Sequence, residues 1–590
     1  MSLLTDASLI LTPNGYNVNK LYSVIPNTTL GDMAVSRGSS ATRVNSAGLI
    51  EIARTNLVLR SEEFDLNLPW ATLLATVTAN ATTAPDGTVT ADKLIAAATS
   101  VPPNNHIVLQ QPAGSVNGTT VTFSVFAKAS DFSRIKFVNN AGGPGVADYI
   151  LSGTGNYTLG SGVSANIEAY PNGWYRCLMT YIPINTGNYN IQIRLVNNSN
   201  TDSFLGDGTS GVFLWGAQLE IGETATEYIP TVASIRTKFA GITQDGGFGA
   251  NIPRIDYPPL GGCPSILVEP ARTNVALYSE EFDNAYWSKS LVTITPNATT
   301  APDNTMTADK FIPDGTTSVH QISTSVASNA YTFSVFAKAG GETTFSMWLL
   351  GATVRAEFNL STGTIIVNTA TSANIEPYPN GWYRCSVYSS TAGTTAQIYG
   401  RGGGAFAGNG VDGIFLWGAQ LEAGSNATSY IPTTTIPLTR TDDIISRTGI
   451  SILIGQAEGT IFWDVKNLTG STASGNPDFS IKNTAFTNWI GLTSNTSASP
   501  FRVTARAIGL GNIIDYSANI TSAKACLKYG TFGAKLFLNG NPTPVATSVV
   551  NPNFSFDNIL FRGSLFSYKT NSFALWTTAL TDDQCKNLTT

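Results

Sequence analysis

The strongest constraint on the fold is an internal duplication. The segment RTNLVLRSEEFD at 54–65 returns as RTNVALYSEEFD at 272–283. Each copy then repeats the same short blocks in the same order, down to FLWGAQLE at 213–220 and 415–422. Copy 1 is longer between the shared blocks, and such differences belong in loops, because an insertion inside a strand would disrupt its pairing. The chain is therefore expected to contain one fold twice, with altered loops.

The repeated blocks have the alternation of β-strands. In 122–128, every second residue is expected to face one side of a sheet. Asn-Gly turn dipeptides stand just before a strand-like run at 172–173 and 380–381. No window of helical length shows a clean period of 3.6 residues. Short strands with regular turn signals predict a jelly-roll β-sandwich for each copy, 54–231 and 272–433.

Composition excludes several classes of function. The chain has 590 residues, with 33 Lys+Arg against 39 Asp+Glu, and only 12% of its residues are charged. There is no basic excess of the kind that nucleic-acid binding needs. No run of about 18 apolar residues appears, so membrane insertion is not expected. The N-terminus has no basic stretch ahead of its apolar residues, so no secretory signal is expected.

Cysteine and histidine usage limits the chemistry further. The five cysteines are widely spaced and form no CxxC pair, so neither a disulfide framework nor a zinc site is expected. Cys177 and Cys385 are duplicated strand residues, predicted to be buried free thiols. The two histidines, His106 and His320, have no Cys or acidic cluster beside them. We expect them to be surface or half-buried residues rather than acid–base catalysts.

No enzymatic site is predicted. A glycoside hydrolase needs two carboxylates about 5–10 Å apart, and here acids are sparse with no pair standing out in the divergent segments. No GxSxG motif with a histidine partner is present. The glycine run at 401–405 has no Lys-Ser/Thr after it and is therefore not a P-loop.

The shared blocks resemble a module found repeatedly in virion proteins of tailed bacteriophages, and they are similar to carbohydrate-binding-module jelly rolls. The resemblance is carried by RTN…SEEFD, APD…TADK, FSVFAK, GWYR and WGAQLE, and it covers both copies. The leader 1–53, with SRGSSATRVN at 36–45, resembles the leader of the same phage proteins. So does CPSILVEPARTN at 263–274, which normally follows that leader closely. We therefore expect 1–53 and the connector 232–271 to pack together, with copy 1 inserted between them.

The last third of the chain, 434–590, is not a third copy. It has strand patterns at 459–465 and 535–541 and ends in a short amphipathic turn. It resembles, more loosely, a concanavalin-like (laminin G-like) sandwich. The expected fold class is all-β, with two tandem jelly-roll β-sandwiches followed by a concanavalin-like β-sandwich and a small N-terminal anchoring region.

The resemblance implies a structural phage virion protein, in the head, the collar or a tail fibre or appendage. It would be exposed on the virion surface and display carbohydrate-binding-type modules to host-surface glycans. The alternative is a purely architectural or decoration protein without glycan binding. A depolymerase and an exported bacterial adhesin are weaker alternatives. By analogy with fibres we expect a homotrimer, which contacts other virion proteins through its N-terminal region.

Sugar binding uses exposed aromatic rings together with planar hydrogen-bonding groups. The tryptophans that both copies share, Trp174, Trp382, Trp215 and Trp417, are predicted to be core residues instead. Ligand candidates therefore come from divergent segments, where a scaffold role is the competing interpretation. They are Trp348, Tyr399 and Arg401 in copy 2, Tyr189, Gln192 and Arg194 in copy 1, and Trp489 and Arg502 in the last domain.

The resemblance also suggests a bound structural calcium ion, because jelly rolls of the sugar-binding type often hold one Ca²⁺ between the first and last strands. Glu63 with Glu220, and Glu281 with Glu422, could supply the oxygen ligands. A solvated turn with a capping carboxylate is the competing interpretation and the one that we favour. No other cofactor is expected.

Overall fold

The computed structural model describes residues 3–98, 105–113, 116, 120–139, 145–160, 162–184, 190–222, 224–246, 249–349, 354–470, 479–493, 501–507, 509–552, 554–563 and 566–590. In this part of the chain nearly all regular structure is β-strand, and the one α-helix is α1 (Asp582–Thr589). The prediction of an all-β chain is thus confirmed. No helix among the described residues is long and apolar enough to cross a membrane.

The chain forms two compact units. One, the inserted unit, is Ala53–Gly249, and the other, the main unit, combines Met1–Ile52 with Ala250–Thr590. The connector is divided between them. Its first half forms the hairpin β19 (Arg236–Phe239) and β20 (Ile242–Asp245), and β19 pairs with β6 (Arg54–Asn56) in the inserted unit. Only its second half packs with the leader.

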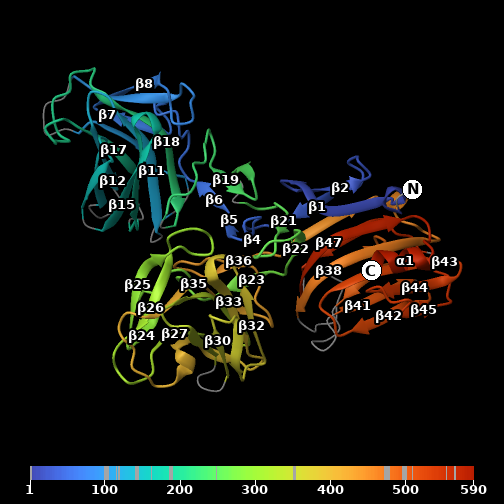
Figure 1. Cartoon of the computed structure of the whole chain (residues 1–590). Coiled ribbons are helices and arrows are strands. Elements are labelled where there is room, and N and C mark those ends of the chain that lie inside the picture. The colour runs from blue at the N-terminus through green and yellow to red at the C-terminus, as the bar shows by residue number, and fades with distance from the viewer. Residues whose placement is uncertain are drawn as a thin grey trace. The chain divides into compact units, whose positions relative to one another are not determined.

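Copy 1 is a sandwich of two six-stranded sheets (Figure 1). Its first sheet has the order β14 (Asn156–Leu159), β13 (Gly145–Ile150), β12 (Arg134–Asn139), β17 (Ile191–Val196), β10 (Ile107–Gln110), β7 (Trp70–Leu73). Its second sheet has the order β15 (Val163–Tyr170), β16 (Trp174–Tyr181), β11 (Val121–Ala129), β18 (Gly211–Ile221), β9 (Ala91–Ala96), β8 (Ala75–Thr82).

Copy 2 repeats this topology strand for strand. Its first sheet runs β31 (Thr364–Asn368), β30 (Val354–Asn359), β29 (Thr344–Leu349), β34 (Gly393–Gly400), β27 (Gln321–Asn329), β24 (Ser288–Ser290). Its second sheet runs β32 (Ser372–Pro377), β33 (Trp382–Tyr388), β28 (Tyr331–Gly340), β35 (Gly413–Ala423), β26 (Ala308–Pro313), β25 (Val292–Thr299). The short β23 (Arg272–Asn274) and β36 (Leu438–Arg440) close the copy, as β6 and β19 close copy 1.

The shared aromatic residues form the framework of both copies. Trp174, Trp382, Trp215 and Trp417 are all buried, as predicted. Cys177 and Cys385 are buried free thiols, also as predicted, and burial raises the pKa of each well above its usual value.

The histidines depart from the prediction. His106 and His320 are both fully buried rather than surface or half-buried. The two histidines occupy equivalent places in the two copies. The main-chain carbonyl oxygen of His106 accepts from the amide of Leu195, and that of His320 accepts from the amide of Gly400, which is the same position of the equivalent strand. Each ring nitrogen faces a main-chain carbonyl oxygen, as in the 2.9 Å contacts of Nε2 with Phe204 and with Phe406. They therefore tie loops to the first sheet of each copy.

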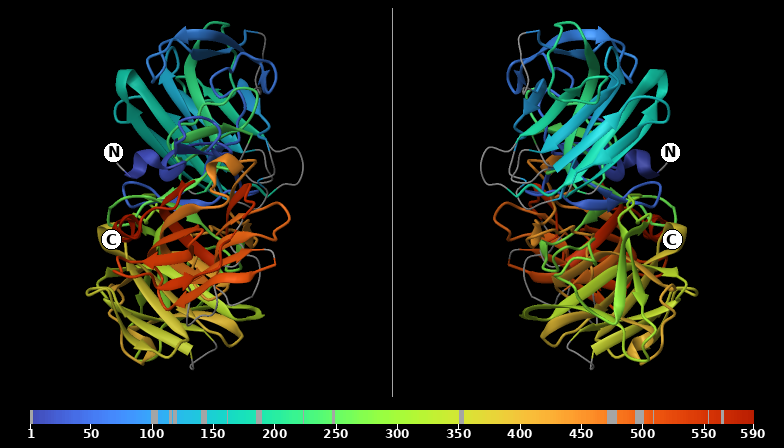
Figure 2. Two further views of the ribbon diagram at one scale, coloured as in Figure 1. Left: turned by 90° about the vertical axis from the view of Figure 1, so that its right-hand side faces the viewer. Right: turned by 90° about the vertical axis from the view of Figure 1, so that its left-hand side faces the viewer.

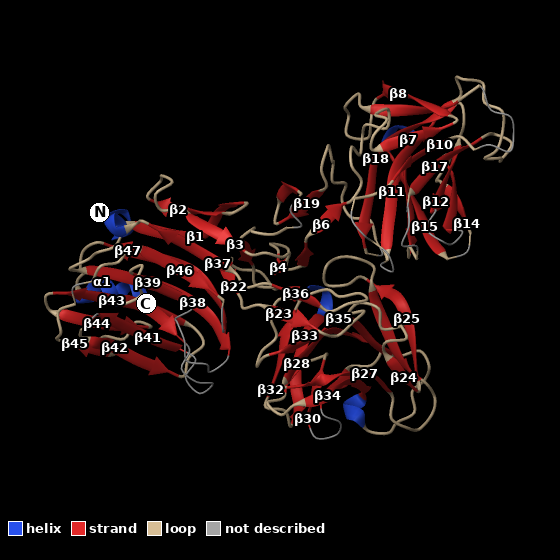
Figure 3. Ribbon diagram, turned by 180° about the vertical axis from the view of Figure 1, so that it is seen from behind, coloured by secondary structure: helices blue, strands red, loops and turns tan. Residues whose placement is uncertain are grey.

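The C-terminal sandwich is built from both ends of the chain (Figure 3). Its strands form one long path in the order β42 (Gly511–Ala518), β41 (Phe501–Ala507), β40 (Trp489–Thr493), β39 (Phe479–Lys482), β46 (Asn558–Arg562), β37 (Ile444–Thr448), β3 (Met33–Ser36), β2 (Lys20–Ile25), β1 (Leu9–Asn17), β47 (Phe566–Trp576), β38 (Gly459–Gly470), β43 (Ala523–Gly530), β44 (Gly533–Leu538), β45 (Ala546–Ser548). The leader strands thus lie between strands of the last domain. From the connector, β21 (Arg254–Asp256) pairs with β22 (Ser265–Val268), which also pairs with β47.

The two chain ends lie on the same side of the sandwich (Figure 2). The short 3₁₀ turn η1 (Leu3–Asp6) begins the leader, and the carbonyl oxygen of Leu3 accepts a 3.1 Å hydrogen bond from Nε1 of Trp576. The N-terminal segment is therefore part of the folded sandwich.

A buried ionic network joins the segments of the main unit. Glu269 accepts from Arg254 Nη1 at 2.6 Å and lies 2.9 Å from Arg440 Nη1. Asp443 pairs with Arg37 at 3.1 Å and also with Arg254. The side chains of all five are at most 5% exposed. Burial lowers the pKa of Arg37 to about 10, an effect that Asp443 opposes.

Glu269→Gln tests the importance of this network. The amide keeps the shape of the side chain but removes the negative charge that faces the buried guanidinium groups of Arg254 and Arg440. We therefore expect the free energy of unfolding to fall by about 3–5 kcal/mol. Arg562→Ala is the control, since it breaks an ion pair with Asp442 whose arginine is 49% exposed, and we expect it to cost less than about 1 kcal/mol. Urea unfolding of the full chain measures both. An equal loss of unfolding free energy in the two variants would contradict a special role for the buried network.

Candidate functional site

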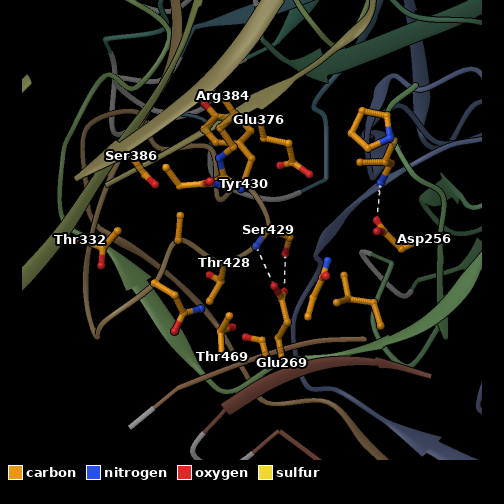
Figure 4. Close-up of a pocket in the computed structure, with 18 of the residues that line it drawn as sticks. Asp256, Glu269, Thr332, Glu376, Arg384, Ser386, Thr428, Ser429, Tyr430 and Thr469 are labelled. Atoms are coloured by element: carbon orange, nitrogen blue, oxygen red, sulfur yellow. Dashed lines mark hydrogen bonds between the residues drawn. The ribbon is translucent and has the colours of Figure 1, made fainter. Parts of the chain in front are cut away.

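A polar cleft of about 610 Å³ lies inside the main unit (Figure 4). Its walls include 42–50 of the leader, 256–269 of the connector, 372–388 and 425–430 of copy 2, and 467–469, 521 and 567–569 of the last domain. Segments that are far apart in the sequence therefore meet around one space.

The copy 2 wall is the outer face of β32 and β33. Asn374 pairs with Ser386, and Glu376 pairs with Arg384, in the antiparallel register of these two strands. Alternate residues of a strand share a face, so hydroxyl, amide and charged groups line the cleft, while Val387 on the other face packs in the core of copy 2.

The opposite wall carries a buried ion pair. Asp256 lies 2.7 Å from Lys569 Nζ, and its other oxygen accepts a 2.7 Å hydrogen bond from the amide of Val44. Burial by itself would lower the pKa of Lys569, but the charge of Asp256 outweighs it and the pKa is raised. Lys569 therefore stays charged, and its charge is matched inside the cleft.

Glu269 reaches the cleft from the ionic network. Its carboxylate accepts from the amide nitrogen of Ser429 at 2.9 Å and from the Ser429 hydroxyl at 2.7 Å, as the dashed lines in Figure 4 show. These bonds hold the 425–430 segment in place as one wall.

Glu376 is a carboxyl of the cleft wall whose pKa is shifted by its surroundings. Burial raises its pKa, and nearby Asp256 adds to the rise, while Lys569 and Arg384 oppose it. Arg384 donates to Ser334 Oγ at 3.2 Å and lies 5.3 Å above the ring of Phe336. A carboxyl accepts hydrogen bonds when it is ionised and donates one when it is protonated.

Three buried polar atoms of the lining have no hydrogen-bond partner among the described residues. They are Nε of Arg384, Oδ1 of Asn426 and Oγ of Ser567. Buried polar groups are nearly always paired, so these three atoms are unsatisfied donors and acceptors in residues that line the cleft. The arrangement suits a molecule rich in hydroxyl groups.

The copy 2 candidates lie elsewhere, at the first sheet. Trp348 and Tyr399 are neighbours with ring centroids 4.4 Å apart, but each is only 8% exposed. Arg355 lies 5.0 Å over Trp348, and the turn η5 (Arg401–Gly403) approaches so closely that a Cβ on Gly403 would be 2.4 Å from the indole. Arg401 itself pairs with Glu342 at 2.6 Å. The two rings are thus brought together but covered.

The copy 1 candidates occupy the equivalent strand, β17. Gln192 and Arg194 share a face, and Arg194 Nη2 donates to Gln192 Oε1 at 2.8 Å. Arg194 also lies 3.8 Å from Asp202, within a charged group that includes Lys136. Tyr189 lies outside the described residues.

The candidates of the last domain have separate partners. The Trp489 ring stacks on Phe486 at 5.8 Å. Arg502 makes two hydrogen bonds to Asp515, at 2.7 and 2.6 Å. They are on adjacent strands, but Trp489 is opposite Arg506 and not Arg502, so the structure does not join them in one site.

The carboxylates proposed for calcium already have protein partners. Glu422 accepts from Gln420 at 2.6 Å and from the amide of Thr428 at 2.8 Å, and Glu220 has the same arrangement in copy 1. Glu63 pairs with Arg60 at 2.7 Å, and Glu281 lies 3.5 Å from the side chain of Asn284. Within the described ranges there is no group of three or more His, Cys, Asp or Glu residues placed to hold a metal.

One wall of the cleft has a signal in the sequence. NIEAYPNGWYR at 166–176 and NIEPYPNGWYR at 374–384 repeat a Glu and an Arg that face each other across paired strands. The other wall, with Asp256 and Lys569, comes from distant segments and had no such signal.

No protein family model matches the chain, and no curated protein matches its sequence.

Replacing Glu376 by glutamine tests its environment. Because its pKa is raised in the folded state, the folded protein retains a proton that the unfolded chain has lost, and the wild type loses stability as pH rises from the ordinary glutamate pKa through the folded value. Glu376→Gln lacks this titration. We therefore expect its stability relative to wild type to increase across that window and to stay constant below it. Urea unfolding from pH 4 to pH 8 measures the difference, and a pH-independent difference would be evidence against this environment.

Proposed function

We propose that the protein is a structural component of a tailed-phage virion, exposed on the particle, that attaches to glycans of the host surface. The resemblance of the repeated blocks to phage virion modules supports the first part. The lining of the polar cleft supports the second, and it is the observation that carries the proposal.

The cleft lining includes many hydroxyl and amide side chains, and it has as many basic as acidic residues. The basic residues are Arg43, Arg384 and Lys569, and the acidic ones are Asp256, Glu269 and Glu376. Arg43 and Lys569 already pair with carboxylates, at 2.7 Å each. Such a site offers no net field for a polyanion but many donors and acceptors for sugar hydroxyls.

Weak binding by one cleft suits a multivalent particle. In a homotrimer, several sites held together would convert later binding events into intramolecular ones, so avidity would exceed the affinity of a single site. The leader strands are part of the C-terminal sandwich, so any contacts that these residues make with other virion proteins would be made by folded surfaces of the main unit.

A purely architectural role is the second candidate function. It is favoured by the covering of Trp348 and Tyr399, since a ring that stacks on sugar must be open, and both residues are only 8% exposed. In that case the two copies would serve as rigid spacers or as decoration of the particle.

Glycan binding by the full-length chain separates the two. We expect binding to a glycan array, and for a glycan so identified we expect Asn374→Ala to weaken the Kd about tenfold, the loss of roughly 1.4 kcal/mol that one or two hydrogen bonds provide. The matched control is Asn166→Ala, the same register position in copy 1, which should leave the Kd unchanged.

Two results would count against the proposal. A folded full-length chain that binds no glycan would favour the architectural role. Binding that is equally insensitive to both substitutions would place the glycan outside the cleft.

A further inference from the structure

Two of the five cysteines meet in one buried cluster of the C-terminal sandwich. Cys526 lies on β43 and Cys585 lies on α1, and both are fully buried free thiols. The same hydrophobic cluster holds Ala7 and Ile10 of the leader. Three parts of the chain that are far apart in the sequence therefore pack around these two thiols.

The alternation of β43 explains why Cys526 faces the helix. Lys524, Cys526 and Lys528 share one side of the strand. Lys524 Nζ donates to the main-chain oxygen of Thr590 at 3.0 Å, just after α1 ends. Lys528 Nζ donates to the main-chain oxygen of Leu580 at 2.8 Å, just before α1 begins. Cys526 stands between the two lysines and therefore points at the middle of the helix.

Cys585 is the residue that α1 presents at this place. The buried residues of the helix are Cys585 and Thr589, which are four positions apart and so share the face that packs on β43. Burial raises the pKa of the Cys526 thiol well above its usual value, and a hydrogen bond with Cys585 and the charge of Cys585 raise it further. The two thiols are thus in hydrogen-bond contact with each other.

The other three cysteines lie apart from one another. Cys177 and Cys385 belong to the separate hydrophobic cores of the two copies, and Cys263 is exposed. Among the described residues, which include all five cysteines, Cys526 and Cys585 are therefore the one pair that the fold brings into contact.

We propose that Cys526 and Cys585 are a redox-active pair, whose disulfide bond fastens α1 to β43 when the protein meets a low-molecular-weight disulfide as oxidant. In the reduced chain the helix is held by non-covalent contacts. In the oxidised chain a covalent bond crosses the buried cluster. This inference does not depend on glycan binding or on a place in a virion.

The bond forms by two thiol–disulfide exchanges. The first cysteine loses its proton, its thiolate attacks one sulfur of the small disulfide, and that S–S bond breaks to release one small thiol. The second cysteine then attacks the protein sulfur of the mixed disulfide and releases the other small thiol. The two cysteines lose two electrons, the small disulfide gains them, and the two cysteine protons end on the released thiols.

The exchange requires α1 to lift from the strand, because both thiols are buried and the thiolate is the form that reacts. The helix has only eight residues, and a helix of that length depends on its packing. It is also held by ion pairs of Asp582 with Lys528 at 2.5 Å and with Lys535 at 2.8 Å. The Asp582 side chain is 47% exposed, so these pairs add little stability, and local opening of α1 is accessible.

The experiment treats the full-length chain with oxidised glutathione. Remaining thiols are then blocked with iodoacetamide in denaturant, and the unreduced digest is analysed by mass spectrometry. We expect a cross-linked peptide pair containing Cys526 and Cys585, with Cys177 and Cys385 alkylated. Cys263 is exposed and should carry glutathione instead, which reports the action of the oxidant on an open thiol.

The bond should also change stability. We expect a higher urea midpoint for the oxidised chain than for the reduced chain, because the cross-link restricts the unfolded state, and dithiothreitol should reverse the gain. Cys585→Ser should abolish both the cross-link and the gain, whereas the control Cys263→Ser should keep both. If Cys585→Ser does not fold, the reversal by dithiothreitol in the wild type decides the question.

The opening of α1 has its own test. Asp582→Asn removes both ion pairs of the helix and should speed the formation of the cross-link severalfold. Asp583→Asn, at the next position of the same first turn, keeps both ion pairs and should leave the rate near that of the wild type. A time course of the cross-linked peptide measures both rates.

Three results would overturn the proposal. The first is a chain in which Cys263 is modified while Cys526 and Cys585 stay reduced, even in urea just below the unfolding transition. The second is a cross-link that lowers the urea midpoint, which would mean that the bond distorts the sandwich. The third is an equal rate in Asp582→Asn and Asp583→Asn, which would mean that opening of α1 is not the route of oxidation.

Discussion

The main unit depends on five ionic side chains that are buried together, three arginines and two carboxylates. Arg37 comes from the leader, Arg254 and Glu269 from the connector, and Arg440 and Asp443 from the junction after copy 2. A charge buried without a partner is far more costly than the pair is favourable, so these segments can only assemble jointly. The hairpin of β4 (Thr42–Val44) and β5 (Ile50–Ile52) and the 425–430 wall are positioned by the same contacts, and the polar cleft is therefore a consequence of the network.

Much of the fold could be predicted because its signals are local in the sequence and occur in both copies. Alternating strands, turn dipeptides and shared tryptophans predict all-β sandwiches and a buried framework, and the structure confirms both. The insertion of leader strands between β37 and β47 could not be predicted, since antiparallel pairing of Ile10 with Ala574 leaves no periodic signal. The candidate site was harder still. Whether Trp348 is open depends on how closely Gly403 approaches it, which composition and spacing do not reveal.

The two copies show how a duplicated sandwich diverges by face. The second sheets keep the same aromatic residues and the same Glu–Arg pair, and in copy 2 this face receives the leader. The first sheets have changed. Gln192 corresponds to Gln397, but Arg194 corresponds to Tyr399, so one copy carries a charged surface and the other a covered aromatic pair. The aromatic face of the second sheet is therefore retained in both copies, while the face of the first sheet varies.

The position of the leader in the sheet has a consequence for synthesis. The ribosome makes β1 long before β47, yet the two are hydrogen-bonded neighbours. The leader strands must wait through the folding of both jelly rolls with unpaired edges, which are prone to aggregation. A chain that stops early has no β47 to receive them. Completion of the C-terminal sandwich thus distinguishes chains that include β47 from chains that stop before it.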